Sequence, residues 1–182
     1  MSIITTCLFH SPIGSLILGA YNRQLCLCDW RKRTHRDSID NQLKIQLSSH
    51  YDDQTVQQHN HSVLVDAKQQ LTEYFQGLRQ QFTIPLLITG TDFQQKVWKT
   101  LAHISFGQTT NYFTLAHRMD HPAAARAVAN ACGANRLSLF IPCHRVIKAN
   151  NMPGGYAGST SAKIWLLRQE KKQINKGKKN LV

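Results

Sequence analysis

The residues best suited to chemistry lie in one short segment, where Pro142 is followed by a thiol, an imidazole and a guanidinium. A thiolate is a strong nucleophile, and cationic neighbours favour its formation. Cys143 beside His144 and Arg145 is therefore a candidate nucleophile. A lone cysteine is more often a small buried hydrophobic residue. The apolar run at 137–141 predicts a buried strand that places Cys143 at its end.

The direct succession of Cys143 and His144 constrains how the two side chains can cooperate. Neighbouring residues of a strand point to opposite faces, so an extended backbone would separate the thiol from the imidazole. We therefore expect a turn between them or one bridging water.

The segment Pro142-Cys143-His144-Arg145-Val146 resembles the active-site motif of the O6-alkylguanine-DNA alkyltransferases. The resemblance is dense from 91 to 170 and weaker before 91, where it rests mainly on 11–16. The further matching positions are Asn135, Tyr112, Arg126, residues 154–158 and residues 165–170. It implies a DNA repair protein that moves an alkyl group from O6-alkylguanine in double-stranded DNA, with O4-alkylthymine as a second candidate substrate, to its own cysteine. Because a thioether is no leaving group in the cell, each molecule acts once, and no cofactor or metal is implied.

The resemblance also implies a role for each matching catalytic position. Cys143 corresponds to the nucleophile, and His144 to the general base that takes the thiol proton through a water. Glu170 corresponds to the acid that holds the imidazole in its useful tautomer, although from sequence alone a surface salt bridge is the simpler interpretation. Tyr112 corresponds to the proton donor to guanine N3, and also to a DNA-binding residue that crowds the target phosphate and helps to rotate the nucleotide out. Asn135 corresponds to the residue that braces the active-site turn.

Three further positions correspond to the surface that enters DNA. Arg126 matches a residue that inserts into the base stack, and the small residues Ala125 and Ala127 beside it let the helix approach the groove. Without the resemblance, the same helix reads as a tightly packed one with Arg126 in solvent. The positions implied for the base pocket are Val146, Tyr156, Ala157 and Arg145.

The composition agrees with a nucleic-acid partner. The chain has 182 residues, enough for one or two domains, and a formal net charge of +12 at pH 7. Such an excess of positive charge favours polyanions by counterion release. The five cysteines lack the spacing of a disulfide framework, and no apolar run approaches a membrane span. These features predict a protein of a reducing compartment, cytoplasmic or, in a eukaryote, nuclear, that acts as a monomer, with cooperative binding along DNA as an alternative.

The hydrophobic pattern predicts an α+β fold. Residues 1–89 form an N-terminal domain, ribonuclease H-like by the resemblance, in which an antiparallel meander of strands is accompanied by helices. Within it, Cys26 and Cys28 are expected on a buried sheet face, with zinc as the minor alternative. Residues 48–61, with their histidines, are expected to form a polar loop. The predicted strands are 3–9, 16–20 and 25–30, and residues 82–88 are expected to form a strand or an extended linker. The predicted helices are 39–47 and 64–78.

Residues 90–170 form the predicted C-terminal DNA-binding and catalytic domain, mostly helical and winged-helix-like by the resemblance. Thr91 opens a capping box, and Gly107 is expected to stop the helix that follows. Helices at 112–119 and 122–131 form a helix-turn-helix, which is a weak signal alone. A loop at 148–158 precedes a helix at 161–170. Residues 171–182 are predicted to be a basic, disordered tail.

Three other functions remain open at this point. A non-enzymatic alkyltransferase-like lesion binder has another residue, often tryptophan, where Cys143 stands. A cysteine hydrolase would use Cys143 and His144, but nothing here suggests an oxyanion hole. A transcription factor would use only the helix-turn-helix.

Overall fold

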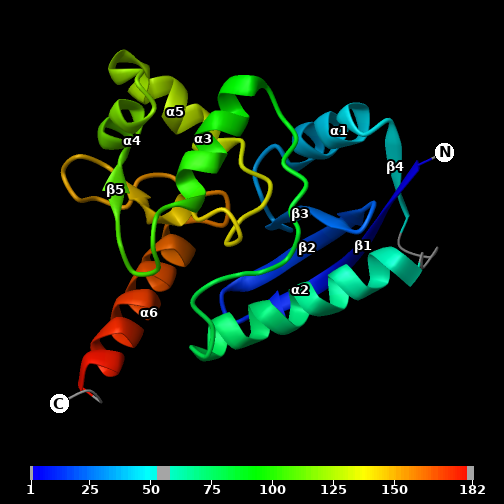
Figure 1. The fold of residues 1–182 in the computed structure, drawn as a ribbon, viewed down its shortest axis with the longest axis horizontal. Helices are drawn as coiled ribbons and strands as arrows, with labels where there is room; N and C mark the ends of the chain where they lie inside the picture. The colour runs from blue at the N-terminus through cyan, green and yellow to red at the C-terminus, as the bar shows by residue number, and fades with distance from the viewer. Residues whose placement is uncertain (1, 53–57, 180–182) are drawn as a thin grey trace. The chain divides into compact units, whose positions relative to one another are not determined.

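The computed structural model describes residues 2–52 and 58–179, and the chain divides into two compact units, Met1–Thr91 and Asp92–Val182 (Figure 1). Unit 1 contains a four-stranded sheet, and unit 2 is mostly helical. Within the described residues, no helix is both long enough and apolar enough to span a membrane.

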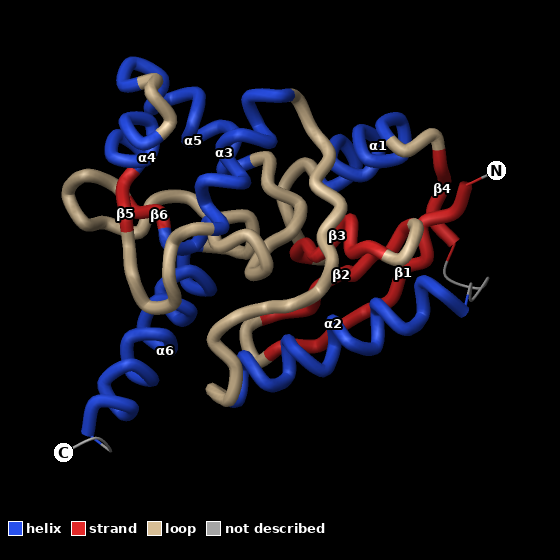
Figure 2. Tube along the Cα trace, in the orientation of Figure 1, coloured by secondary structure: helices blue, strands red, loops and turns tan. Residues whose placement is uncertain are grey.

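The sheet of unit 1 has the strand order β3-β2-β1-β4. Strands β1 (Ser2–Ser11), β2 (Gly14–Tyr21) and β3 (Gln24–Trp30) pair antiparallel, which confirms the predicted meander. Strand β4 (Ser49–Asp52) pairs parallel with β1, so the sheet is mixed (Figure 2). The prediction of a loop at these residues was wrong because a polar edge strand lacks the apolar alternation that identifies a strand.

Two helices cover this sheet. Helix α1 (Arg36–Gln46) contributes Leu43 to a buried cluster with Ile4, Cys26 and Leu27. Helix α2 (Gln58–Gln76) packs on β1, β2 and β3. It begins six residues before the predicted helix, so His61 is helical rather than part of a loop. Both Cys26 and Cys28 are fully buried, as expected for a sheet face.

The segment at 82–88, predicted as a strand or an extended linker, forms only a single bridge with the sheet. Leu25 N donates to Pro85 O at 2.9 Å, and Leu87 N donates to Leu25 O at 2.9 Å. Pro85 has no N–H to donate, which limits a regular ladder at this position.

Unit 2 is built around helices α3 (Asp92–Ala102), α4 (Tyr112–Arg118) and α5 (Ala125–Gly133). A 3-10 turn at Pro122–Ala124 joins α4 to α5, which gives the predicted helix-turn-helix. Trp98 of α3 is buried, and its indole N–H donates to Ala131 O of α5 at 2.8 Å. Helix α3 ends at Ala102, five residues before the predicted stop at Gly107, and turns fill the interval.

Helix α6 (Thr160–Lys179) corrects the predicted end of the domain. The sequence placed the end of this helix at Glu170 and disorder from 171, but the helix continues for nine further residues of the described chain. Ile174 is half-buried, and a Cβ added to Gly107 would overlap its Cδ1 atom. This contact gives the extension an apolar anchor that the surrounding lysines conceal in the sequence.

Candidate active site

The backbone that carries Cys143 is a buried loop, not the predicted strand. Residues 137–141 form a turn in which Ile141 N donates to Leu137 O at 2.8 Å, and Leu139 has a φ of 73°. Cys143–Arg145 then forms one 3-10 turn. This turn is the change of direction expected between Cys143 and His144. An apolar run alone does not distinguish a buried strand from a buried turn.

Asn135 holds this loop from inside. It is 1% exposed, its Oδ1 accepts from Leu137 N at 2.9 Å, and its Nδ2 donates to Ile141 O at 2.9 Å. The same Nδ2 lies 3.2 Å from the Sγ atom of Cys143. One amide therefore fixes the turn and also contacts the candidate nucleophile.

His144 and Glu170 form a fully buried pair. The His144 Nε2 atom lies 2.8 Å from Glu170 Oε1, and both side chains have 0% exposure. Burial lowers the pKa of His144, while the hydrogen bond that it donates to Glu170 opposes the shift. A neutral ring that donates through Nε2 to a carboxylate keeps Nδ1 unprotonated. Nδ1 is buried and has no hydrogen-bond partner among the described residues, so it is the nitrogen able to accept a proton.

Arg145 neutralises the buried carboxylate. Its Nε and Nη2 atoms both donate to Glu170, at distances of 3.0 to 3.3 Å, and its Nη1 atom donates to Ile104 O at 2.6 Å. Gly107 N donates to Glu170 Oε2 at 2.8 Å. Burial alone would raise the pKa of Glu170, but the hydrogen bonds from His144 and Arg145, together with the positive charge of Arg145, hold it well below its usual value.

This arrangement gives Arg145 a structural role. All three nitrogens of the Arg145 guanidinium bond to Glu170 or Ile104, and the group also lies 5.6 Å from the centre of the Phe106 ring. Arg145 therefore supports Glu170 directly, and its place in the base pocket stays a prediction.

Tyr112 reaches the site through a short parallel sheet. Strand β5 (Thr110–Asn111) pairs with β6 (Val146–Ile147), so the start of α4 lies beside the residues that follow Cys143. A Cβ placed on Gly154, whose φ is 72°, would lie 3.7 Å from the Tyr112 hydroxyl. Burial, followed by the nearby Cys132 and Cys143 thiols, raises the pKa of Tyr112 to about 12, so it remains a proton donor.

The remaining predicted pocket residues lie on both sides of the turn. Val146 is buried, and Tyr156 and Ala157 are half-buried in the loop that precedes α6. The Tyr156 ring lies edge-on to the His144 ring, with 6.3 Å between their centres. Tyr156 thus lies next to His144, the candidate general base. Among the described residues, no hydrogen bond joins Ala157 to His144 or Cys143.

Lys163 is a site residue that the sequence interpretation missed. It is 1% exposed, and its ammonium group donates to Val146 O at 2.5 Å and lies 3.5 Å from Gly155 O. Burial lowers the pKa of Lys163, whereas the thiols of Cys143 and Cys132 act in the opposite direction. Lys163 precedes Glu170 by two helical turns, so a helical pattern that includes polar residues would have placed both on the inner face.

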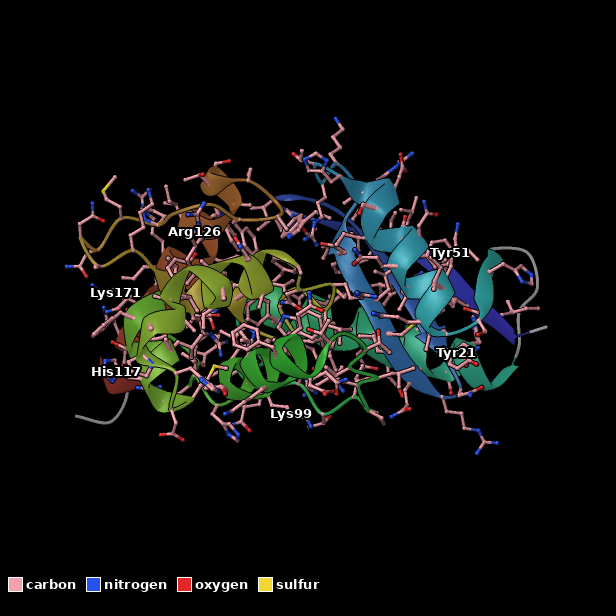
Figure 3. The ribbon with its side chains drawn as sticks, turned by 90° about the horizontal axis from the view of Figure 1, so that it is seen from above. Tyr21, Tyr51, Lys99, His117, Arg126 and Lys171 are labelled. Carbon is pink, nitrogen blue, oxygen red and sulfur yellow. The ribbon has the colours of Figure 1, made fainter. Side chains whose placement is uncertain are left out.

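The predicted DNA-entering residues lie away from this cluster, near the start of α5. Arg126 and Ala127 are exposed, and Ala125 is half-buried. Figure 3 shows Arg126 on α5, with Lys99 of α3 at a different edge of unit 2. Within the described residues, no group of three or more His, Cys, Asp or Glu side chains is placed to hold a metal ion.

Comparison with known protein families assigns both parts of the chain. Residues 92–172 match the DNA binding domain of 6-O-methylguanine DNA methyltransferase, and residues 4–88 match the ribonuclease-like domain of the same family. The methylated-DNA--protein-cysteine methyltransferase of Mycobacterium leprae is 35% identical over 164 residues, which is 90% of each chain. The constitutive Bacillus subtilis relative is 47% identical over 122 residues, covering 65% of this chain and 74% of the relative.

Solved structures give the same relationship at the level of the fold. The crystal structure of Mycobacterium tuberculosis O6-methylguanine methyltransferase matches 93% of this chain and 94% of its own chain, with 34% identity and a TM-score of 0.77. The structure of the Mycobacterium tuberculosis protein OGT in complex with DNA has 33% identity, a TM-score of 0.76 and 94% coverage of each chain.

We expect Glu170→Gln to lower the free energy of unfolding by about 3 to 5 kcal/mol, because it leaves the Arg145 guanidinium buried without its counter-charge. The folded pKa of Glu170 lies below the unfolded value near 4.5. Its contribution to stability is therefore fully present above that pH and is lost progressively as the pH falls from there through the lower folded pKa. Thermal unfolding across an acid pH series checks both effects, with Glu73→Gln, in the half-buried pair of Glu73 and Arg79, as a control. An unchanged acid limb in Glu170→Gln would contradict the argument.

Proposed function

Because the chain belongs to the family of methylated-DNA--protein-cysteine methyltransferases, we propose that Cys143 is the cysteine that accepts the alkyl group. The protein is a DNA repair enzyme that transfers the alkyl group of O6-alkylguanine in DNA to its own thiol. The observation that supports Cys143 is its position beside the buried His144 and Glu170 pair, with Asn135 bonded to its sulfur. The resulting thioether ends the activity of that molecule.

Proton removal from the thiol is assigned to His144. The Nε2 atom of this ring is bonded to Glu170, so the thiol proton moves to Nδ1 through one water. Glu170 stays ionised throughout because Arg145 and Gly107 also donate to it. The carboxylate thereby fixes the tautomer and stabilises the imidazolium that forms.

The sulfur attacks the alkyl carbon, and the bond between that carbon and O6 breaks with its electron pair going to guanine. Tyr112 supplies a proton to guanine N3, so that the base leaves neutral. The high pKa of Tyr112 keeps that proton in place until charge develops on the base. Val146 and Tyr156 are assigned to the pocket of the flipped base, because both adjoin the turn that carries Cys143.

Access to the target atom requires the nucleotide to leave the stack. This costs a few kcal/mol of pairing and stacking, and a side chain that fills the gap offsets part of it. Arg126 is the candidate for that wedge, since it is exposed at the start of α5 between the small residues Ala125 and Ala127. We assign this step and the chemistry to residues 90–170, with the protein acting as a monomer on duplex DNA and with cooperative binding as the alternative.

A second candidate function is a lesion binder that does not transfer the alkyl group. Such proteins lack a cysteine at the acceptor position, and the buried lysine beside Cys143 supports transfer instead. A positive charge near a sulfur favours the thiolate, which transfer requires and binding does not.

Replacing Cys143 by Ala should abolish alkyl transfer and preserve binding to methylated duplex DNA. Intact mass spectrometry after incubation with methylated DNA measures the transfer, because only an acceptor gains the mass of a methyl group. The control is Cys132→Ala, which removes the other thiol near the site and should still gain one methyl group. Methyl gain by Cys143→Ala would disprove the assignment.

Replacing Arg126 by Ala should slow repair of methylated duplex by roughly 10- to 100-fold, since the cost of flipping is no longer offset. Reaction with the free alkylated base should be unchanged. Lys99→Ala removes an exposed positive charge elsewhere in unit 2 and serves as the matched control. An equal loss on duplex and free base would exclude a wedge.

Replacing Lys163 by Met keeps the aliphatic volume but removes the buried charge, so the rate of methyl transfer should fall roughly tenfold or more at neutral pH. The deficit should shrink as the pH rises, because the thiolate then forms without help. Single-turnover rates over a pH series provide the measurement. A deficit that is the same at every pH would assign Lys163 a structural role only.

A further inference from the structure

From Leu166 onward, helix α6 has an inner face and an outer face of different chemistry. The inner face carries Leu166 and Glu170, both fully buried, and the half-buried Gln173 and Ile174. These positions recur at helical spacing, and Ile174 contacts the turn at Gly107. The extension is therefore anchored to unit 2, and its outer face has a fixed direction.

The outer face of α6 carries four cations and no acidic residue from Arg168 to Lys176. Arg168, Lys171, Lys172, Asn175 and Lys176 follow the spacing i, i+3, i+4, i+7 and i+8, and all five are exposed. The only acidic residue in the helix is Glu170, which is buried and neutralised by Arg145. Among the described residues no ion pair involves these four cations. The face therefore presents four uncompensated positive charges on one rigid element.

The chemistry of this face indicates which kind of partner it can bind. A protein interface has an apolar or aromatic centre, and the outer face of α6 exposes none. A row of cations without apolar residues matches the phosphate backbone of a nucleic acid, which is bound through counterion release without sequence readout. An acidic protein segment is the competing partner, but it would lack the hydrophobic contacts that make such an interface specific.

The position of this face sets it apart from the surface that enters DNA. In Figure 1, α6 runs from the centre of unit 2 toward the C-terminus, away from the end where α4 and α5 lie. Arg126 lies on α5 and Lys171 on α6, at separate places on unit 2 in Figure 3. A duplex held by α5 therefore leaves the basic face of α6 available to another segment.

We propose that the outer face of α6 is a second DNA-binding surface, which contacts the phosphates of a duplex segment other than the one held by α5. This inference rests on the proposed function of α5 and Arg126. A protein with two such surfaces passes from one segment to the next without entering free solution. That route shortens the search for rare lesions in a repair protein that acts once.

The test uses the full-length protein with Lys172→Gln and Lys176→Gln combined. The charge-matched control combines Lys32→Gln and Lys99→Gln, which are exposed residues outside α6. The first readout is the dissociation of a labelled undamaged duplex as unlabelled duplex is added in excess. In the wild type and the control, dissociation should become faster as competitor increases, whereas in the α6 variant it should be independent of competitor concentration.

The second readout is the salt dependence of affinity under conditions of excess duplex. The slope of log K against log salt should become shallower by about 0.9 for each lost phosphate contact, or about 1.8 for the α6 variant relative to the wild type. Identical slopes and competitor-dependent dissociation in the α6 variant and the control would overturn the proposal. They would leave an acidic protein as the remaining kind of partner.

Methyl gain from the free alkylated base separates this inference from the proposed function. The α6 variant should react with the free base at the wild-type rate, because none of its changes touches Cys143, His144 or Glu170. Normal reaction together with competitor-dependent dissociation would refute the second surface alone. Loss of the reaction in the wild type itself would refute the proposed function instead.

Discussion

The structure of the site depends on one buried negative charge. A carboxylate that leaves water is strongly unfavourable unless other groups replace its hydration. Glu170 is fully buried and receives donors from two separate segments, His144 and Arg145 in the turn that carries Cys143 and Gly107 in the turn before β5. Each of these segments is thereby fixed in relation to α6. The turn with Cys143 and the turn before β5 are positioned because they both satisfy Glu170.

The charge of Glu170 gives different roles to two basic side chains that are adjacent in the chain, His144 and Arg145. Arg145 compensates Glu170 permanently, since a guanidinium does not deprotonate in proteins. His144 is therefore not needed as a counter-ion and can remain neutral, as its lowered pKa indicates. Without Arg145, the carboxylate would hold the imidazole in its charged form, and a charged imidazole cannot accept a proton. The two tasks therefore require two different side chains in succession.

Sequence patterns predicted the elements with a clear hydrophobic period and the residues of a dense motif. The strands at 3–30, the helix containing Trp98 and the pair of helices around Pro122 could all be recognised by local rules. The loop at 137–141 could not, because its apolar residues fill a turn held by a single amide of Asn135. Polar residues on inner faces were also missed. Lys163 looked like an ordinary surface lysine, and the support that Arg145 gives to Glu170 was not expected, because sequence alone does not show which polar groups meet in the interior.

Helix α6 carries both buried and solvent-exposed charges. Its inner face contributes Lys163 and Glu170 to the interior, where each charge is matched by carbonyl groups or by an opposite charge. Its outer face carries cations of similar chemistry whose charge is exposed to solvent. A buried charge with fixed partners can assist one reaction at one atom, whereas exposed charges act on any polyanion within a Debye length. The buried and the exposed charges alternate by face rather than by position, because Glu170 lies between the exposed Arg168 and Lys171 but points to the interior.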